Sequence, residues 1–264
     1  MTPATPPDTL TPAELAPQID ALVIEDETPV DNFFSAKLQR MLIEILYSSW
    51  ASLGMERPFV ADADIGIFSS VHRPPIVPDV FISMDVEAPQ DFREKKNRTY
   101  LIWEFGKSPD VVVEIVSNKV GNELVSKLQD YARLGVTYYV VFDPLQQLGD
   151  DVLHVFGLTH GDYERLEQPW LERIGLGLTL WEGTFEDVTA TWLRWCDSAS
   201  ADLSVRDGQL LPTGTERAAQ AEAKTTEAEA KVTEAEAKAS AAEEKAAKLA
   251  EQLRALGVDP EQFT

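Results

Sequence analysis

The chain has 264 residues, which is enough for one full domain with extensions or for two domains at most. Hydrophobic residues make up 44% of it and aromatic residues 9%, so a sizeable core can form and a wholly disordered chain is excluded. With 23 Lys and Arg against 45 Asp and Glu, the net charge of -22 excludes a general coat for nucleic acid or anionic membranes, although it leaves room for a small, metal-bridged phosphate site.

Cysteine usage and hydropathy predict the compartment. The single cysteine, Cys196, excludes an internal disulfide framework and a cysteine-based zinc site, and it fits a reducing environment. No apolar run approaches the roughly 18 residues of a membrane span, and the first ten residues lack the cationic start and apolar stretch of a secretory signal. We therefore expect a cytoplasmic protein with no membrane partner.

Charge and composition divide the chain into three predicted parts. Residues 1–31 contain no Lys or Arg and many prolines, which predicts an acidic, flexible arm. Residues 32–212 form the predicted globular domain. Residues 213–264 are rich in Ala, Glu and Lys, which predicts a helical tail. Lys recurs every seven residues there, so a coiled coil with a weak, Ala-lined seam and a solvated single helix are both open interpretations.

Taken in chain order, the hydrophobic spacing of the globular part predicts an α/β domain with a central mixed sheet. A first helix of about 20 residues follows Asn32, which can cap it, and ends at Gly54. A second helix covers about residues 121–134 and stops at Gly135. The last of the predicted strands alternates in polarity and is expected to close the sheet. The predicted strands cover residues 58–61, 64–68, 77–86, 99–105, 110–117, 137–144, 151–158, 162–167 and 178–188.

Two carboxylates lie in apolar predicted strands, where each is expected to need an ion-pair partner or a metal. Asp79 follows Pro78 and precedes an apolar run, and Glu114 has β-branched residues on both sides. Acids are seldom buried unless they are paired or bound to a metal. The helix that follows carries Lys127, which strand–turn–helix connectivity can fold back over the strand end. Two carboxylates with a backbone carbonyl suit Mg²⁺ or Mn²⁺, and a nearby lysine can position a water or stabilise charge on a phosphate.

Four segments in this order resemble the PD-(D/E)XK nuclease superfamily, and within it the Uma-type family of restriction-endonuclease-like proteins. They are PD at 78–79, PDVVVEIVSNK at 109–119, K-x-x-x-Y at 127–131 and GVTYYVVFDP at 135–144. The resemblance implies a restriction-endonuclease-like core, a central mixed sheet flanked by helices, with metal-dependent phosphodiester hydrolysis as its chemistry.

The resemblance also implies roles for individual residues. Asp79 matches the first acid of the motif and Glu114 the second, with the Ile115 carbonyl as an additional metal ligand. Glu44, on the first helix, matches an acid that some members add to the metal site. The motif's lysine position is occupied by Val116, and the family places its lysine on the next helix, where Lys127 fits and Lys119 is the alternative.

We therefore expect a Mg²⁺- or Mn²⁺-dependent DNA endonuclease. The alternative is a non-catalytic binding or assembly module that retains the nuclease fold and acts through its helical tail. A homodimer or a tail-mediated oligomer is also open, because two strands are cut most simply by two sites related by a twofold axis. A cationic loop could seat the DNA backbone, although a solvated loop is the alternative. The residues considered for DNA contact are Arg73, Arg93, Lys95, Lys96 and Arg98.

Overall fold

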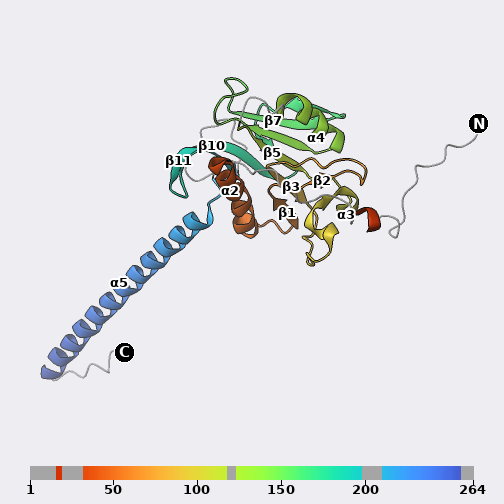
Figure 1. Ribbon diagram of the computed structural model, residues 1–264. Coiled ribbons are helices and arrows are strands. Elements are labelled where there is room, and N and C mark those ends of the chain that lie inside the picture. The colour runs from red at the N-terminus through yellow and green to blue at the C-terminus, as the bar shows by residue number, and fades with distance from the viewer. Residues whose placement is uncertain (1–15, 20–31, 118–122, 198–209, 257–264) are drawn as a thin grey trace, which may run out of the picture. The chain divides into compact units, whose positions relative to one another are not determined.

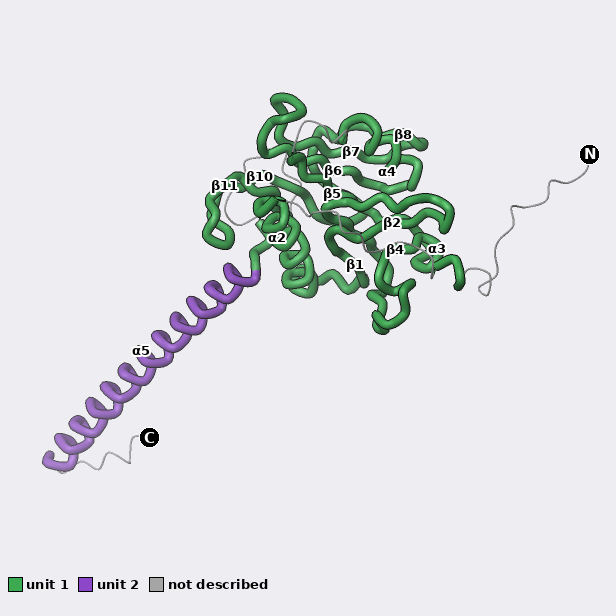
Figure 2. Tube along the Cα trace, viewed as in Figure 1, with its two compact units in different colours: residues 1–213 green, residues 214–264 purple. Residues whose placement is uncertain are grey.

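The computed structural model describes residues 16–19, 32–117, 123–197 and 210–256. Its contacts divide the chain into two compact units, residues 1–213 and residues 214–264 (Figure 2). Residue 19, within the predicted arm, is buried against Phe68 and Leu101. The rest of that arm, residues 1–15 and 20–31, lies outside the described residues, so its flexibility stays a prediction.

The first helix forms where the sequence predicts it. Helix α2 (Phe33–Ser49) is capped by Asn32, whose side chain accepts hydrogen bonds from the backbone N–H groups of Phe34 and Ser35, both at 3.0 Å. These bonds satisfy two N–H groups that would otherwise lack a partner at the start of the helix. The short helix η1 (Trp50–Leu53) continues the segment to Gly54, whose φ of 70° lies in the left-handed region that favours glycine.

The central sheet is mixed and has six strands in the order β1-β3-β5-β6-β7-β8 (Figure 1). Strands β5 and β6 are parallel, and the other neighbouring pairs are antiparallel. The predicted α/β class with a central mixed sheet is therefore confirmed. The strands are β1 (Phe59–Asp62), β3 (Val80–Met84), β5 (Val111–Ile115), β6 (Tyr138–Phe142), β7 (Leu153–Thr159) and β8 (Asp162–Arg165).

The two faces of this sheet carry separate cores. Val111, Val113 and Ile115 of β5 join a core that includes the buried face of α2. Val112 points the other way and joins a second core with Tyr131 of helix α4 (Leu128–Leu134). Alternate residues of a strand point to opposite faces, so Glu114 lies on the α4 face together with Val112.

The final predicted strand, 178–188, begins and ends earlier than expected, at residues 176 and 185, and it does not close the central sheet. Instead β10 (Leu176–Phe185) and β11 (Val188–Cys196) form a hairpin that pairs with β9 (Trp170–Leu171) in a separate three-stranded sheet. The turn residues Glu186 and Asp187 both have positive φ, 44° and 64°. Glu-Asp lacks the Asn-Gly or Asp-Gly signal that marks such a turn, which explains why the hairpin was not predicted.

The predicted strand at 99–105 is also partly wrong. Only β4 (Tyr100–Leu101) is extended, in parallel with β2 (Ile67–Phe68), and residues Ile102–Phe105 form the helical turn α3. Gly106, with φ of 73°, ends this turn. A short apolar run fits a helix and a strand equally well, because periodicity cannot separate them over so few residues. A short 3₁₀ turn, η2 (Lys95–Arg98), precedes β4.

The second compact unit contains the helix α5 (Gly214–Ala255), 42 residues long. The predicted helical tail is confirmed over this range. None of the helix residues is buried, so its stability within the chain comes from helix propensity and from pairs along its own surface. Two such pairs join Glu227 to Lys231 and Glu234 to Lys238.

Candidate active site

Asp79 lies at the point where the ladder between β3 and β5 ends. Val80 pairs with Val113 and Ile82 with Val111. Continued by two residues, this register would place Ile115 opposite Pro78, whose missing N–H cannot donate to the Ile115 carbonyl. The Pro78 carbonyl accepts the Asp64 N–H, and the Ile115 N–H donates to the Asp79 Oδ2 at 2.5 Å. The Pro-Asp pair thus fixes one carboxylate beside the residue that follows Glu114.

Glu114 is buried, with 2% of its surface exposed, and both of its carboxylate oxygens have donors. Oε2 accepts from the Lys127 ammonium at 2.8 Å, and Oε1 accepts from the Tyr131 hydroxyl at 2.6 Å. Both donors come from one helical segment, Lys127 from the π-helical turn η3 (Glu123–Lys127) and Tyr131 from α4. The spacing of four residues places them one above the other on the same side. The structure therefore brings Glu114 and Lys127 together across thirteen residues of sequence.

The charges of this cluster depend on one another. Burial raises the pKa of Glu114 above its usual value, and the Lys127 charge with the two hydrogen bonds opposes that shift. Burial is the largest influence on Lys127 and acts to lower its pKa, but the charge and hydrogen bond of Glu114, together with the charges of Glu123 and Asp79, outweigh burial and the net shift is upward. The pKa of Tyr131 is raised as well, because burial and the neighbouring Glu114 disfavour a phenolate. Lys127 and Tyr131 thus act at neutral pH as hydrogen-bond donors.

Glu123 joins this cluster and was not selected from the sequence. Its side chain is 7% exposed, and its Oε1 lies 3.6 Å from the Lys127 Nζ, one helical turn away. The other oxygen, Oε2, is buried and has no hydrogen-bond partner among the residues that the structure describes. A buried, unpartnered carboxylate oxygen is costly, which makes it a feature of functional sites. The i,i+4 spacing of Glu123 to Lys127 is visible in the sequence, but the spacing alone does not distinguish a buried pair from an exposed one.

The donor types of this site fit a hard divalent cation. Carboxylates at Asp79 and Glu114 and the backbone of Ile115 are oxygen ligands of the kind that Mg²⁺ and Mn²⁺ prefer. Each Glu114 oxygen accepts one hydrogen bond from Lys127 or Tyr131, and a carboxylate oxygen has a second lone pair. Within the described residues, however, no three His, Cys, Asp or Glu side chains form a group placed to hold a metal ion. The metal roles of these residues therefore stay predictions.

Two other predicted residues are not placed at the cluster. Glu44 is half-buried on α2, the helix that packs on the opposite face of the sheet from Glu114. Its role as a metal ligand stays a prediction. The alternative lysine, Lys119, lies outside the described residues.

The cationic loop is largely paired with its own acids. Arg93 contacts Asp91 at 2.8 Å, and Lys96 lies 3.4 Å from Glu94 and 3.8 Å from Glu104. Exposed ion pairs of this kind are worth about 0–1 kcal/mol, so a phosphate could displace the acid at small cost. Of the remaining residues considered for DNA contact, Arg73 and Arg98 are exposed and Lys95 is half-buried.

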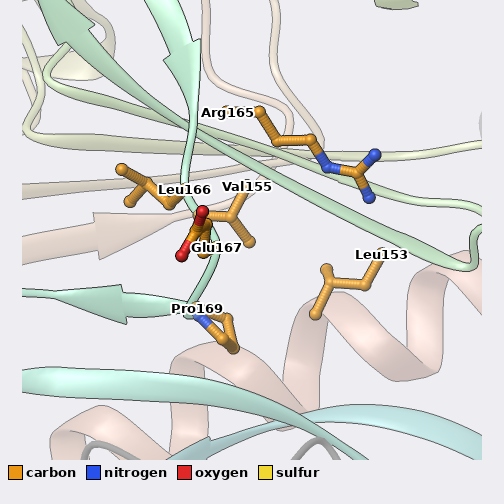
Figure 3. A pocket seen from close by; sticks show the side chains of 6 residues that line it. All are labelled: Leu153, Val155, Arg165, Leu166, Glu167 and Pro169. Carbon is orange, nitrogen blue, oxygen red and sulfur yellow. The ribbon is translucent and has the colours of Figure 1, made fainter. Parts of the chain in front are cut away.

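A cavity of about 470 Å³ lies elsewhere in the domain (Figure 3). Leu153 and Val155, which line it, belong to the core on the α2 face, whereas Glu114 points to the α4 face. The cavity therefore does not form part of the cluster around Glu114. Its lining residues are Leu153, Val155, Arg165, Leu166, Glu167 and Pro169.

No helix in the ranges that the structure describes combines the length and the apolar character needed to traverse a bilayer.

The described residues thus combine a mixed sheet flanked by helices with a buried Glu114–Lys127 pair at the end of a central strand, beside the Asp79 carboxylate. Residues 21–184, more than half of the chain, match the Uma2 family, which is described as "Putative restriction endonuclease". The chain belongs to this family, as its sequence motifs predicted.

A solved structure is similar over part of the chain. It is a protein from Anabaena variabilis ATCC 29413 described as "a putative nuclease belonging to DUF820". The two share 16% sequence identity with a TM-score of 0.38, over 53% of this chain and 71% of that one. No curated protein matches the chain.

Proposed function

We propose that the protein is a divalent-metal-dependent endonuclease that hydrolyses phosphodiester bonds in DNA. The observation that carries the proposal is the Glu114–Lys127 pair at 2.8 Å, beside the Asp79 carboxylate that holds the next residue of the strand. A buried strand carboxylate with an ammonium at its side is costly to maintain for stability alone, because a well-packed apolar pair is often as stable. Family membership supports the same conclusion.

In this proposal Asp79, Glu114 and the Ile115 carbonyl hold Mg²⁺ or Mn²⁺. The bound ion would lower the pKa of a water molecule and draw charge from a phosphate oxygen. Lys127, protonated at neutral pH, would orient the attacking water and stabilise negative charge on the phosphate. Tyr131 holds Glu114 in place from the protein side, and Glu123 provides a second carboxylate for the Lys127 ammonium.

DNA binding has to work against the charge of the domain. Residues 32–212 carry 16 Lys and Arg against 27 Asp and Glu, so few cations are available to replace the counterions of DNA. We propose that Arg73 and the loop at 91–98 supply the phosphate contacts. Binding should then weaken as salt rises. The compartment we propose is the cytoplasm, where a buried cysteine thiol such as that of Cys196 stays reduced.

The test is nicking of supercoiled plasmid in Mg²⁺ or Mn²⁺ by the full-length protein. Asp79→Asn, Glu114→Gln and Lys127→Met keep side-chain size and should each lower the rate at least a hundredfold, the scale of one positioned catalytic group. A matched control is Lys107→Met, since Lys107 also pairs with a buried acid, Asp110, near the opposite end of β5.

The control variant should keep the wild-type rate once its folding is confirmed by circular dichroism. Cleavage that persists in all three site variants would show that the activity belongs to a contaminant. If the wild-type protein cleaves nothing and neither ion changes its melting temperature, the alternative is correct: a binding or assembly module that acts through α5.

A further inference from the structure

The exposed helix α5 has one narrow apolar stripe along its whole length. Read as a heptad, two positions carry small or aliphatic residues in every repeat, with Thr225 as the one polar member. Val232, Leu249 and Leu256 are 56%, 53% and 78% exposed, so the stripe is uncovered on the described chain. Spacings of three and four residues keep these side chains on one face. The stripe consists of Ala218, Ala221, Thr225, Ala228, Val232, Ala235, Ala239, Ala242, Ala246, Leu249, Leu253 and Leu256.

Charges of opposite sign flank the stripe on its two sides. The stripe residues form the seam of the heptad, and each repeat contributes two of them, at positions a and d. The residue before position a is cationic in five successive repeats, and the residue after position d is acidic in four. In heptad notation these are the g and e positions, which set partner choice and orientation in coiled coils. The cations are Arg217, Lys224, Lys231, Lys238 and Lys245, and the acids are Glu222, Glu229, Glu236 and Glu243.

The open surface around the middle of the stripe is formed by seam residues Thr225, Ala228 and Val232, with a cation and an acid on its two sides. The flanking pair is Lys224 and Glu229, and Thr233 completes the lining. Small seam residues let a second helix approach closely, and the flanking charges can then reach across to it.

We propose that α5 pairs with the α5 of a second copy of this chain in a parallel, two-stranded coiled coil. In a parallel pair each g residue faces the e′ residue of the following repeat, so Lys224 meets Glu229′ and Lys231 meets Glu236′. In an antiparallel pair g faces g′ and e faces e′, which sets lysine against lysine and glutamate against glutamate. The charge pattern thus matches a second copy of the same helix in one orientation.

The seam consists mostly of Ala, so we expect the association between two helices to be weak. Ala buries little apolar area, and the larger residues Leu249, Leu253 and Leu256 gather toward the C-terminal end of the helix. The lysines at 231 and 238 already pair within the helix with Glu227 and Glu234, and these exposed pairs exchange at small cost. We expect an association that depends on concentration and on salt. The inference does not rest on nuclease activity.

Parallel pairing has a consequence for the rest of the chain. Because α5 begins directly after residue 213, the N-terminal ends of two parallel helices lie together, and both globular units are joined at that same end. Parallel pairing would therefore connect two globular units to the same end of the coiled coil.

The first experiment measures mass in solution by sedimentation equilibrium of the full chain. The wild-type protein should approach twice its 29.3 kDa as concentration rises. Lys224→Glu, Lys231→Glu and Lys238→Glu together make both sides of the seam acidic and should weaken the dimer about tenfold or more, since several pairs of about 0.2–0.5 kcal/mol are lost and replaced by repulsion. The counterpart carries Glu229→Lys, Glu236→Lys and Glu243→Lys. Neither variant should pair with itself, but an equimolar mixture should regain the dimer mass.

The second experiment tests orientation through a disulfide between identical positions. Ala242→Cys places a thiol in the seam, where a parallel pair brings the two copies face to face, and mild oxidation should cross-link them. Glu234→Cys places it outside the seam and is the matched control. A monomeric wild type, a threefold mass, a dimer that survives the acidic variant, or equal cross-linking at both positions would each overturn the proposal. A monomeric wild type would leave α5 as a single solvated helix or as a docking helix for a different protein.

Discussion

The hydrogen bond from Tyr131 to Glu114 can be tested by removing a single oxygen atom. Tyr131→Phe keeps the ring, which is fully buried against Tyr139 with ring centroids 5.0 Å apart, and deletes the hydroxyl that donates to Glu114 Oε1 at 2.6 Å. A hydrogen bond to a charged group contributes about 1.5–3 kcal/mol. For a domain of this size that loss corresponds to a fall in Tm of about 3–12 °C.

A second tyrosine provides the matched control. The hydroxyl of Tyr163 donates to the backbone carbonyl of Val136 at 2.8 Å, a neutral acceptor. Tyr163→Phe should therefore cost only about 0.5–1.5 kcal/mol. The measurement is urea or thermal unfolding of both variants, followed by circular dichroism, with the difference between them reporting the charge of the Glu114 carboxylate.

The pH dependence sharpens the test. The Tyr131 hydroxyl acts to lower the pKa of Glu114, and burial nevertheless keeps that pKa above its ordinary value of 4.5. Deleting the hydroxyl raises the pKa further, so the extra destabilisation is full at high pH and declines as pH falls through the raised values toward 4.5. Equal losses in both variants, or a loss from Tyr131→Phe that does not change with pH, would refute a charged carboxylate at this site.

Two further predictions concern stability away from the site. Asn32→Ala removes the cap of α2 and should lower the free energy of unfolding by about 1 kcal/mol, whereas Asn32→Asp keeps an acceptor and should cost little; urea unfolding of both separates capping from other effects. Glu186 bonds to Arg40 and Lys37, which lower its pKa to about 2, and its side chain is 38% exposed. Glu186→Gln should therefore cost less than about 1 kcal/mol above pH 5, and this difference should vanish as pH falls from 4.5 to about 2; a constant difference in melting temperature would contradict the ion-pair explanation.

The acid–lysine cluster was accessible from the sequence because its members lie in patterns with strong local meaning. An acid inside a β-branched run needs a partner, and a following helix has few ways to supply one. The structure accordingly joins Glu114 to Lys127, as the strand–turn–helix reading suggested. The roles of Asp79, Glu114 and Lys127 in catalysis still await the nicking assay.

What the sequence could not supply depends on long-range packing. Glu123 becomes part of the cluster only because its side chain is buried beside Lys127, and an i,i+4 pair on an exposed helix would look the same in sequence. The hairpin of β10 and β11 depends on two residues with positive φ that carry no turn signal. Its place on α2 is fixed by contacts such as the Trp195 Nε1 bond to the Leu42 carbonyl at 2.9 Å, which join residues 153 positions apart.

The strand that carries Glu114 also limits how this protein can vary. Since neighbouring residues of β5 point into different cores, adding or deleting one residue between Asp110 and Glu114 would turn the carboxylate into the apolar core against α2 and bring Val113 or Ile115 into its place. Substitutions can be absorbed along this strand, but changes in length cannot. Length variation among relatives should therefore gather in exposed connections such as residues 145–151, between β6 and β7, and spare the five residues of β5.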